Sequence, residues 1–257
     1  MVKYADDATI IDTVLKANET TTHKTGRERQ ITITDNTIQS AANEAVLWCE
    51  NTSQRINASK QYMMLTLQIN AAVSPSINIK GETVQQMKTA KLLGVTIDLH
   101  LTFSSHTKSV VDKTRSAVHG LLTLKRHGVS TASLIKFYQA RITPILTYAA
   151  PSWYSYIPQY AADQLERHQS LCLRLIYPTV SSYTKRLKLS RIPRINDLLR
   201  SMCCKYVAKV ANDPTHKLHH HIPEKQSSHR HSTRLANNHR PTSRTALLSI
   251  SIFHKYL

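Results

Sequence analysis

The apolar residues of this 257-residue chain have a mostly strand-like spacing before about residue 104 and a helical spacing after it. Before that point, short runs rich in β-branched residues lie between polar loops and predict strands, and one stretch, 37–54, has apolar residues at helical spacing. After it, apolar residues recur every three or four positions through 106–126, 134–148, 162–176 and 183–200. We therefore predict an α+β protein: an incomplete antiparallel sheet with a backing helix, followed by an all-helical region.

The predicted domains are 1–103, 104–212 and a basic, His-rich tail at 213–257. Charge divides the chain in a similar way. Residues 1–100 contain 10 Lys and Arg and 10 Asp and Glu, whereas residues 101–257 contain 24 and 6, so the whole net charge of +18 lies in the second part. A strongly basic region favours a polyanionic partner such as nucleic acid. A chain that is merely basic is the alternative.

Two adjacent carboxylates, Asp6 and Asp7, stand between β-favouring residues near the start of the chain. Residues 2–5 and 8–14 suit the strands of a hairpin, with the two aspartates in its turn. An ordinary acidic hairpin tip is one interpretation. The other is a magnesium site, because paired carboxylates supply the hard oxygen ligands that Mg²⁺ prefers.

The box Tyr4-Ala5-Asp6-Asp7 resembles the Tyr-X-Asp-Asp box of reverse transcriptases, and residues 3–10 resemble its version in non-LTR (LINE-type) retrotransposons. The resemblance implies an RNA-directed DNA polymerase whose partners are an RNA template and a DNA primer. It also implies that Asp6 and Asp7 are catalytic and bind Mg²⁺, within a site where two ions about 3.5–4 Å apart support nucleotidyl transfer. In this family the sheet is the palm and the helices after it are the thumb.

A second motif supports the same resemblance. Residues 91–106, Lys-Leu-Leu-Gly-Val-Thr-Ile-Asp-x-x-Leu-Thr-Phe-x-x-His, are similar to the motif that follows the palm in this family. The resemblance implies a hairpin around Leu93 and Gly94 that grips the primer end. From the residues alone, 88–98 predicts a buried strand interrupted at Gly94, where a bulge or a close backbone approach fits.

Between the two motifs, Trp48, Asn57 and Lys60 resemble the family's Trp-containing turn and Asn-x-x-Lys segment, although Gln61 departs from the usual hydroxyl residue. The resemblance implies that Lys60 is catalytic, as a general acid near the triphosphate. A solvated lysine at the start of a strand is the alternative.

The helical region resembles the family's thumb and its extension. The matching residues are Phe137, Tyr138, Ile142, Pro144, Leu146, Tyr148 and Trp153, then Gln169, Cys172, Arg174 and Ile176. Pro144 predicts a kink or break in its helix. In helix 162–176 we predict one apolar face, formed by Leu165, His168, Leu171, Cys172 and Leu175.

Basic residues on these helices suit phosphate contacts, which are individually weak but additive. We predict nucleic-acid binding by Lys108, Lys113, Arg115, Lys125, Arg126, Lys185, Arg186, Lys188 and Arg191. A solvated basic face is the alternative.

The resemblance covers about residues 1–205 and matches the C-terminal half of a reverse transcriptase domain. The family's fingers and the palm strand with a third metal-binding carboxylate belong upstream, so we expect the isolated chain to be inactive and the upstream half of the polymerase to be a further partner. A truncated remnant that binds nucleic acid without catalysis is the alternative function.

The remaining features bound the environment of the protein. The four cysteines lack Cys-x-x-Cys spacing, which is typical of core thiols in a reducing compartment, so we expect an intracellular protein, cytoplasmic or nuclear. No stretch approaches the roughly 18–20 apolar residues that span a bilayer. Eight of the 14 histidines lie in 216–254 without the spacing of a zinc site, which predicts a loosely ordered basic tail.

Overall fold

The computed structural model describes residues 2–4, 7–9, 37–54, 56, 61–64 and 77–222. These residues fall into two compact units. The first takes its residues from Met1–Ala90 and Asp98–Leu101, and the second from Lys91–Ile97 and Thr102–Leu257. The combination of helices and short strands agrees with the α+β class.

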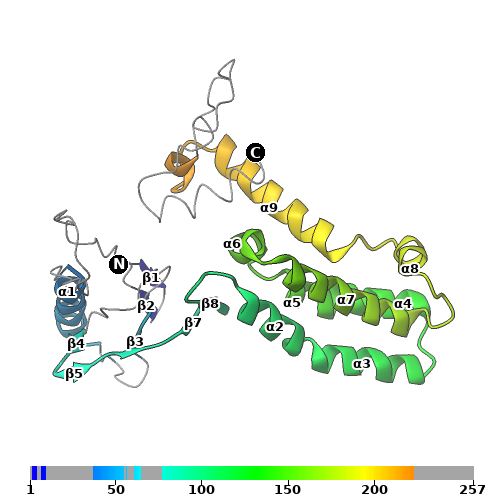
Figure 1. Ribbon diagram of the computed structural model, residues 1–257, viewed down its shortest axis with the longest axis horizontal. Helices are drawn as coiled ribbons and strands as arrows, with labels where there is room; N and C mark the ends of the chain where they lie inside the picture. Colours follow the sequence, from blue (N-terminus) through cyan, green and yellow to red (C-terminus); the bar gives the residue numbers. More distant parts are fainter. Residues whose placement is uncertain are drawn as a thin grey trace, which may run out of the picture. The chain divides into compact units, whose positions relative to one another are not determined.

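The strands of the described residues pair two by two (Figure 1). Antiparallel pairs join β1 (Val2–Tyr4) to β2 (Asp7–Thr9) and β4 (Asn78–Ile79) to β5 (Glu82–Thr83), whereas β3 (Tyr62–Met63) and β6 (Gln85–Gln86) are parallel. The prediction of one antiparallel sheet therefore differs from the structure over the described residues. Each of these strands is two or three residues long and bonds to a single neighbour.

The first hairpin confirms the predicted antiparallel pairing but shifts its turn. Tyr4 pairs with Asp7, which begins β2, so Asp7 lies in a strand and not in the predicted turn. The prediction that both aspartates form the turn is wrong by this one residue.

Helix α1 (Thr37–Asn51) confirms the predicted helix and is joined to the β4–β5 hairpin. The Gln39 side-chain amide donates to the carbonyl of Asn78 at 2.7 Å and accepts from the Asn78 amide at 2.9 Å. An ion pair of 3.1 Å between Lys80 and Glu50 adds a second link. Because the amide of Gln39 satisfies both backbone groups of one strand residue, it fixes the helix on the hairpin.

The stretch 88–98 forms a hairpin, β7 (Thr89–Leu92) and β8 (Val95–Asp98), rather than the single interrupted strand that its residues alone predict. Leu93 and Gly94 connect the strands with φ of 45° and 84°. Two successive positive φ values are typical of the tight turn that matches strand twist. The hairpin implied by the family resemblance is therefore present.

The second unit is helical. Its helices are α2 (Ser104–Lys113), α3 (Arg115–Arg126), α4 (Thr131–Phe137), a π-helix (Tyr138–Ile142), α5 (Thr143–Thr147), α6 (Ala150–Trp153), α7 (Gln159–Ile176), α8 (Tyr183–Ser190) and α9 (Ile195–Asn212), with 3₁₀ turns at Tyr154–Tyr156 and His219–His221. The predicted break at Pro144 is confirmed, because the π-helix ends and α5 begins just before this residue, which has no N–H to give.

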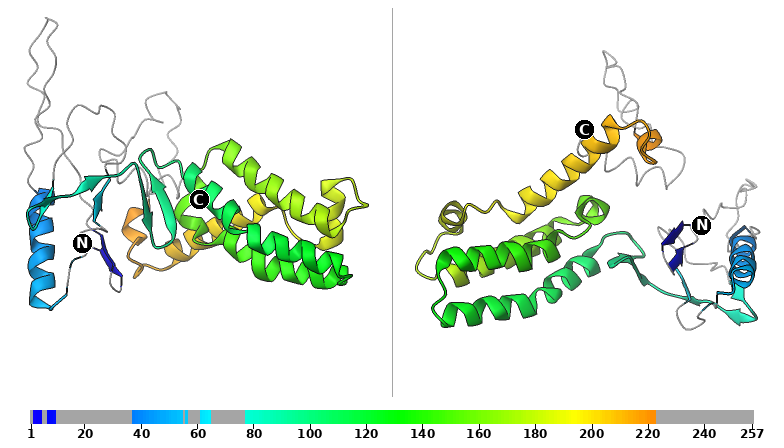
Figure 2. Two further views of the ribbon diagram at one scale, coloured as in Figure 1. Left: turned by 90° about the horizontal axis from the view of Figure 1, so that it is seen from below. Right: turned by 180° about the vertical axis from the view of Figure 1, so that it is seen from behind.

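Helices α3, α4 and α7 lie side by side (Figure 2), and the core of this unit also takes side chains from the π-helix, α5, α6 and α9. Its fully buried large side chains include Leu121, Leu134, Tyr138, Ile142, Leu146, Trp153, Leu165, Leu173, Ile176, Ile195 and Leu199. The apolar face predicted for α7 is wrong at Leu171, which is 40% exposed, while Gln169 and Leu173 are buried.

Two of the four thiols have the core position predicted for them. The cysteines are free, and Cys172 and Cys203 are buried in the core. Burial raises the pKa of the Cys172 thiol to about 12, so it is inert. In the described part of the chain, no helix combines the length and the apolar character needed to cross a membrane.

Candidate nucleic-acid interface and primer-end turn

The Leu93–Gly94 turn is held by a tyrosine of the helical unit. The Tyr148 hydroxyl donates to the Leu93 carbonyl at 2.9 Å. A Cβ atom placed on Gly94 would lie 3.3 Å from Cε1 of Tyr148. Glycine is therefore required at this position both for the positive φ and for the close approach of the ring.

The same turn is held from β8 by a histidine. The Thr96 amide donates to Nδ1 of His106 at 3.1 Å. The His106 ring is buried edge-on against Trp153, with 5.1 Å between ring centroids, and Nε1 of Trp153 donates to the Tyr148 carbonyl at 2.8 Å. These contacts link the two sides of the turn through His106, Trp153 and Tyr148. We call the group the turn clamp, and its residues are Leu93, Gly94, Thr96, His106, Tyr148 and Trp153.

His106 works in this clamp as a neutral ring. Burial, helped by the charge of Lys113, lowers its pKa from 6.5 to about 4. Because Nδ1 accepts the Thr96 hydrogen bond, the neutral ring carries its proton on Nε2, which is buried without a partner in the described residues. A protonated ring would lose the acceptor that holds β8.

Strained backbone surrounds the turn clamp. Leu93, Phe103 and Ala149 have φ of 45°, 53° and 49°, in the left-handed region that costs a non-glycine residue about 1 kcal/mol or more. Leu93 is in the turn, Phe103 precedes the helix that carries His106, and Ala149 follows Tyr148. Such strain persists where packing determines the conformation and is frequent at functional sites.

Six of the nine predicted phosphate-binding side chains are exposed, with no ion pair or hydrogen bond to the described residues. They are Lys108, Lys113 and Arg126 on α2 and α3, and Lys185, Lys188 and Arg191 on and just after α8. These side chains are available to a polyanion.

The other three have partners within the protein. Arg115 pairs with Asp112 at 2.7 Å on the surface, and Nζ of Lys125 donates to the Ile176 carbonyl at the end of α7 at 3.3 Å. Arg186 is 5% exposed, and its guanidinium donates to the carbonyls of Ser170 and Ser181 at 2.9 and 3.0 Å. The structure therefore contradicts the nucleic-acid role predicted for Arg186, whose charge is used inside the fold.

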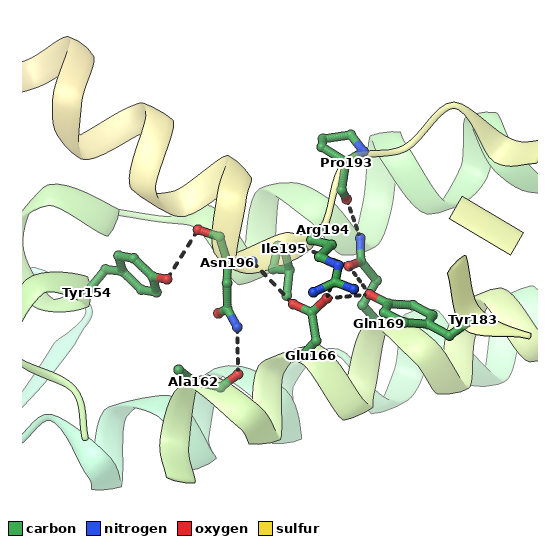
Figure 3. Close-up of polar contacts among 9 residues, drawn as sticks. All are labelled: Tyr154, Ala162, Glu166, Gln169, Tyr183, Pro193, Arg194, Ile195 and Asn196. Carbon is green, nitrogen blue, oxygen red and sulfur yellow. Dashed lines mark hydrogen bonds and ion pairs between the residues drawn. The ribbon is translucent and has the colours of Figure 1, made fainter. Parts of the chain in front are cut away.

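A buried polar network joins α8 and α9 to α7 (Figure 3). Gln169, almost fully buried, donates through Nε2 to the Pro193 carbonyl at 2.9 Å, and its Oε1 accepts from the Ile195 amide at 2.7 Å. The Tyr183 hydroxyl lies 2.7 Å from the same oxygen. One glutamine thus fixes the start of α8 and the start of α9.

Glu166, one turn before Gln169, completes this network. Its Oε1 lies 2.7 Å from the Tyr183 hydroxyl and 4.0 Å from Nε of Arg194, and its Oε2 accepts from the Asn196 amide at 3.4 Å. Burial, together with the hydrogen bond to Glu166, raises the pKa of Tyr183. The phenol therefore remains protonated, with its hydrogen shared between two oxygens. Figure 3 shows both acceptors converging on it.

The predicted metal and triphosphate residues lie mostly outside the described residues. Asp6 and Lys60 are not described, and of Asp7 the structure gives the backbone, at the first position of β2. Among the described residues, no group of three or more His, Cys, Asp or Glu side chains is placed to bind a metal ion.

Among known proteins, two relatives from Drosophila melanogaster align with this chain. An RNA-directed DNA polymerase from the mobile element jockey is 25% identical over 174 residues, which is 65% of this chain and 18% of the relative. The chain is related to the reverse transcriptases of non-LTR retrotransposons. A putative 115 kDa protein in the type-1 retrotransposable element R1DM is 25% identical over 131 residues, 50% of this chain and 12% of the relative.

The chain thus spans less than a fifth of the length of either relative. No family model and no solved structure matches it.

No functional role is predicted from the sequence for three residues of the turn clamp. His106, Tyr148 and Trp153 all lie in the family-like segments, which is the signal that could have singled them out. The sequence does not show that these residues contact one another around the turn, because Tyr148 is 55 residues from Leu93 in the chain.

Proposed function

We propose that this chain is part of an RNA-directed DNA polymerase whose helical unit holds the template–primer duplex, with the Leu93–Gly94 turn at the primer end. The turn clamp carries this proposal. Tyr148 and His106, two side chains of the helical unit, fix a family-like turn through hydrogen bonds of 2.9 and 3.1 Å. A rigid turn suits the positioning of a reacting end, because small displacements of a reactant lower the rate steeply.

The exposed cations support the duplex-binding part of the proposal. Lys108, Lys113 and Arg126 and the α8 group, Lys185, Lys188 and Arg191, are exposed and unpaired within the described residues. Each can replace a counterion on a phosphate, and these contributions add along a duplex. In this proposal the first unit corresponds to the palm and the helical unit to the thumb.

The catalytic part of the proposal rests on Asp6, Asp7 and Lys60. Adjacent carboxylates have the donor chemistry for Mg²⁺, and these two would bind it. When bound, Mg²⁺ neutralises charge on the reacting phosphate oxygens. Lys60 would lie near the triphosphate and donate a proton to the departing pyrophosphate.

Two assays test the proposal. Fluorescence anisotropy with a labelled RNA–DNA hybrid should give binding that weakens steeply with KCl. Primer extension on poly(rA)/oligo(dT) with Mg²⁺ then compares the chain with its Asp6→Asn/Asp7→Asn variant.

The two assays separate the candidate functions. Extension that disappears in the variant supports a polymerase. Salt-dependent binding without extension supports the alternative, a nucleic-acid-binding module without catalysis. A chain that does not bind the hybrid at low salt would refute both.

A further inference from the structure

Tyr148 presents a fixed aromatic ring to solvent. Its side chain is 53% exposed although its hydroxyl is bonded to Leu93 and its own carbonyl is bonded to Trp153. These two hydrogen bonds, one from the hydroxyl and one to the backbone carbonyl, restrict the side-chain torsions before any ligand binds. Binding to this ring therefore costs little side-chain entropy.

Only part of the ring is used by the turn clamp. The atoms Cε1, Cζ and Oη face Gly94, and a Cβ there would lie 3.3 to 3.7 Å from them. Leu93, 46% exposed, stands beside it in the turn. The exposed part of the ring and the exposed leucine are thus apolar groups at the same turn, on a strongly basic helical unit.

A rigid exposed ring on a polyanion-binding surface suits a nucleotide base. Aromatic rings bind bases by stacking, and this contact tolerates every base because each has a π-face. Inside a duplex, both faces of a base are already covered by neighbouring base pairs. The open face is found at a terminal base pair or at an unpaired nucleotide next to it.

We propose that Tyr148 is a stacking platform for the terminal nucleotide of the bound duplex, with Leu93 packing beside it. The proposal rests on the function proposed above and adds the residue that contacts the primer end. It gives the Tyr148 hydroxyl a separate task, which is to hold the turn.

The test uses an RNA–DNA hybrid with a recessed DNA 3′ end that carries 2-aminopurine as its last nucleotide. Stacking on Tyr148 should change the 2-aminopurine fluorescence on titration with the protein, and the same label in the interior of the hybrid should not respond. A hybrid whose two ends are closed by polyethylene glycol linkers, which carry no bases, measures duplex binding without an open end.

Two variants separate the ring from the hydroxyl. Tyr148→Leu should lose the fluorescence change and weaken binding to the recessed hybrid about tenfold, with little effect on the closed hybrid. Tyr148→Phe keeps the ring and should stay within about threefold of the wild type. Tyr160→Leu is the matched control, because Tyr160 is 61% exposed and its hydroxyl bonds Ser104 at 2.6 Å.

Each result decides between the proposals. If the closed hybrid binds but Tyr148→Leu and Tyr160→Leu behave alike, the platform is refuted while duplex binding stands. If Tyr148→Phe is as weak as Tyr148→Leu, the hydroxyl and not the ring matters, which also refutes stacking. Failure of the wild type to bind either hybrid overturns the proposed function itself.

Discussion

At the scale of single residues, the position of a charge in the fold decides what it does. Arg186 and Lys188 are two residues apart on α8, yet one guanidinium is buried on two carbonyls and the other side chain is exposed. Both look alike as members of a basic segment. The first therefore contributes to the stability of the fold, whereas the second is exposed and is part of the polyanion-binding surface that we propose.

Replacing Arg186 should therefore destabilise the fold rather than weaken nucleic-acid binding directly. Arg186→Gln leaves the carbonyls of Ser170 and Ser181 without the guanidinium, and we expect a loss of about 2–3 kcal/mol in the free energy of unfolding. Urea denaturation measures it. Lys188→Gln is the control, with stability unchanged within about 0.5 kcal/mol and weaker hybrid binding. Equal stability of the two variants would contradict this assignment.

The buried His106 makes stability depend on pH. Its folded pKa of about 4 is below the unfolded value of 6.5, so on acidification the unfolded state takes up the proton first. This residue should therefore lower the free energy of unfolding as pH falls from about 6.5 toward 4, by about 2 kcal/mol between pH 7 and pH 5.

The measurement is urea denaturation at both pH values for the wild type and His106→Asn. Asparagine can still accept from Thr96 but does not titrate, so the pH dependence should be smaller in the variant by that amount. Using the difference removes the contribution of His168, whose pKa is also lowered by burial. An identical pH dependence in both proteins would show that His106 is not the group responsible.

At the scale of elements, two hairpin turns have similar backbone conformations but different surroundings. Gly81 and Gly94 both have φ of 84° and follow a residue with positive φ, Lys80 or Leu93. A Cβ atom placed on Gly81 would have nothing within 4 Å, whereas Gly94 faces the Tyr148 ring.

Alanine at either glycine should destabilise its turn by about 1 kcal/mol through the positive φ alone. Gly94→Ala should also displace Tyr148 and so speed amide hydrogen exchange at Val95 and Thr96. In Gly81→Ala, exchange at these two amides should be unchanged. If Gly94→Ala left their exchange rates at wild-type values, the close packing of the tyrosine on the turn would be disproved.

The polar network on α7 holds the elements that follow it. Gln169→Leu removes the acceptor of the Ile195 amide and the donor to the Pro193 carbonyl in a buried site, and should cost about 2–4 kcal/mol. Urea denaturation tests the loss, and faster exchange at the Ile195 amide tests its location. Gln164→Leu, on the same helix and half-buried without a hydrogen bond in the described residues, should be nearly neutral. A Gln169→Leu protein as stable as this control would argue against the network.

At the scale of the whole molecule, the charge of the helical unit predicts how binding responds to salt. Replacing Lys185, Lys188 and Arg191 by Gln removes three phosphate contacts, so the slope of log affinity against log salt should become shallower by about 2–3. The control replaces three other exposed cations, Arg200, Lys205 and Lys209 on α9, with the same change in net charge. If both triple variants changed the slope equally, net charge rather than a defined surface would govern binding.

Features that depend on neighbouring residues could be predicted from the amino-acid sequence. Helical spacing located most helices, and Pro144 marked the break before α5. Two motifs pointed to the family to which the relatives belong. Periodicity located these elements because backbone bonding and side-chain direction repeat over a few residues.

Contacts between side chains that are distant in the sequence became visible in the folded protein. The tertiary structure buried Arg186, exposed Leu171, paired the short strands two by two and brought Tyr148, His106 and Trp153 around the Leu93–Gly94 turn. Asp6 and Lys60 lie outside the described residues, so their proposed roles stay predictions. Such long-range contacts could not be predicted because they join residues far apart in the sequence. A contact between residues 55 apart depends on how whole helices pack, and local periodicity does not encode that packing.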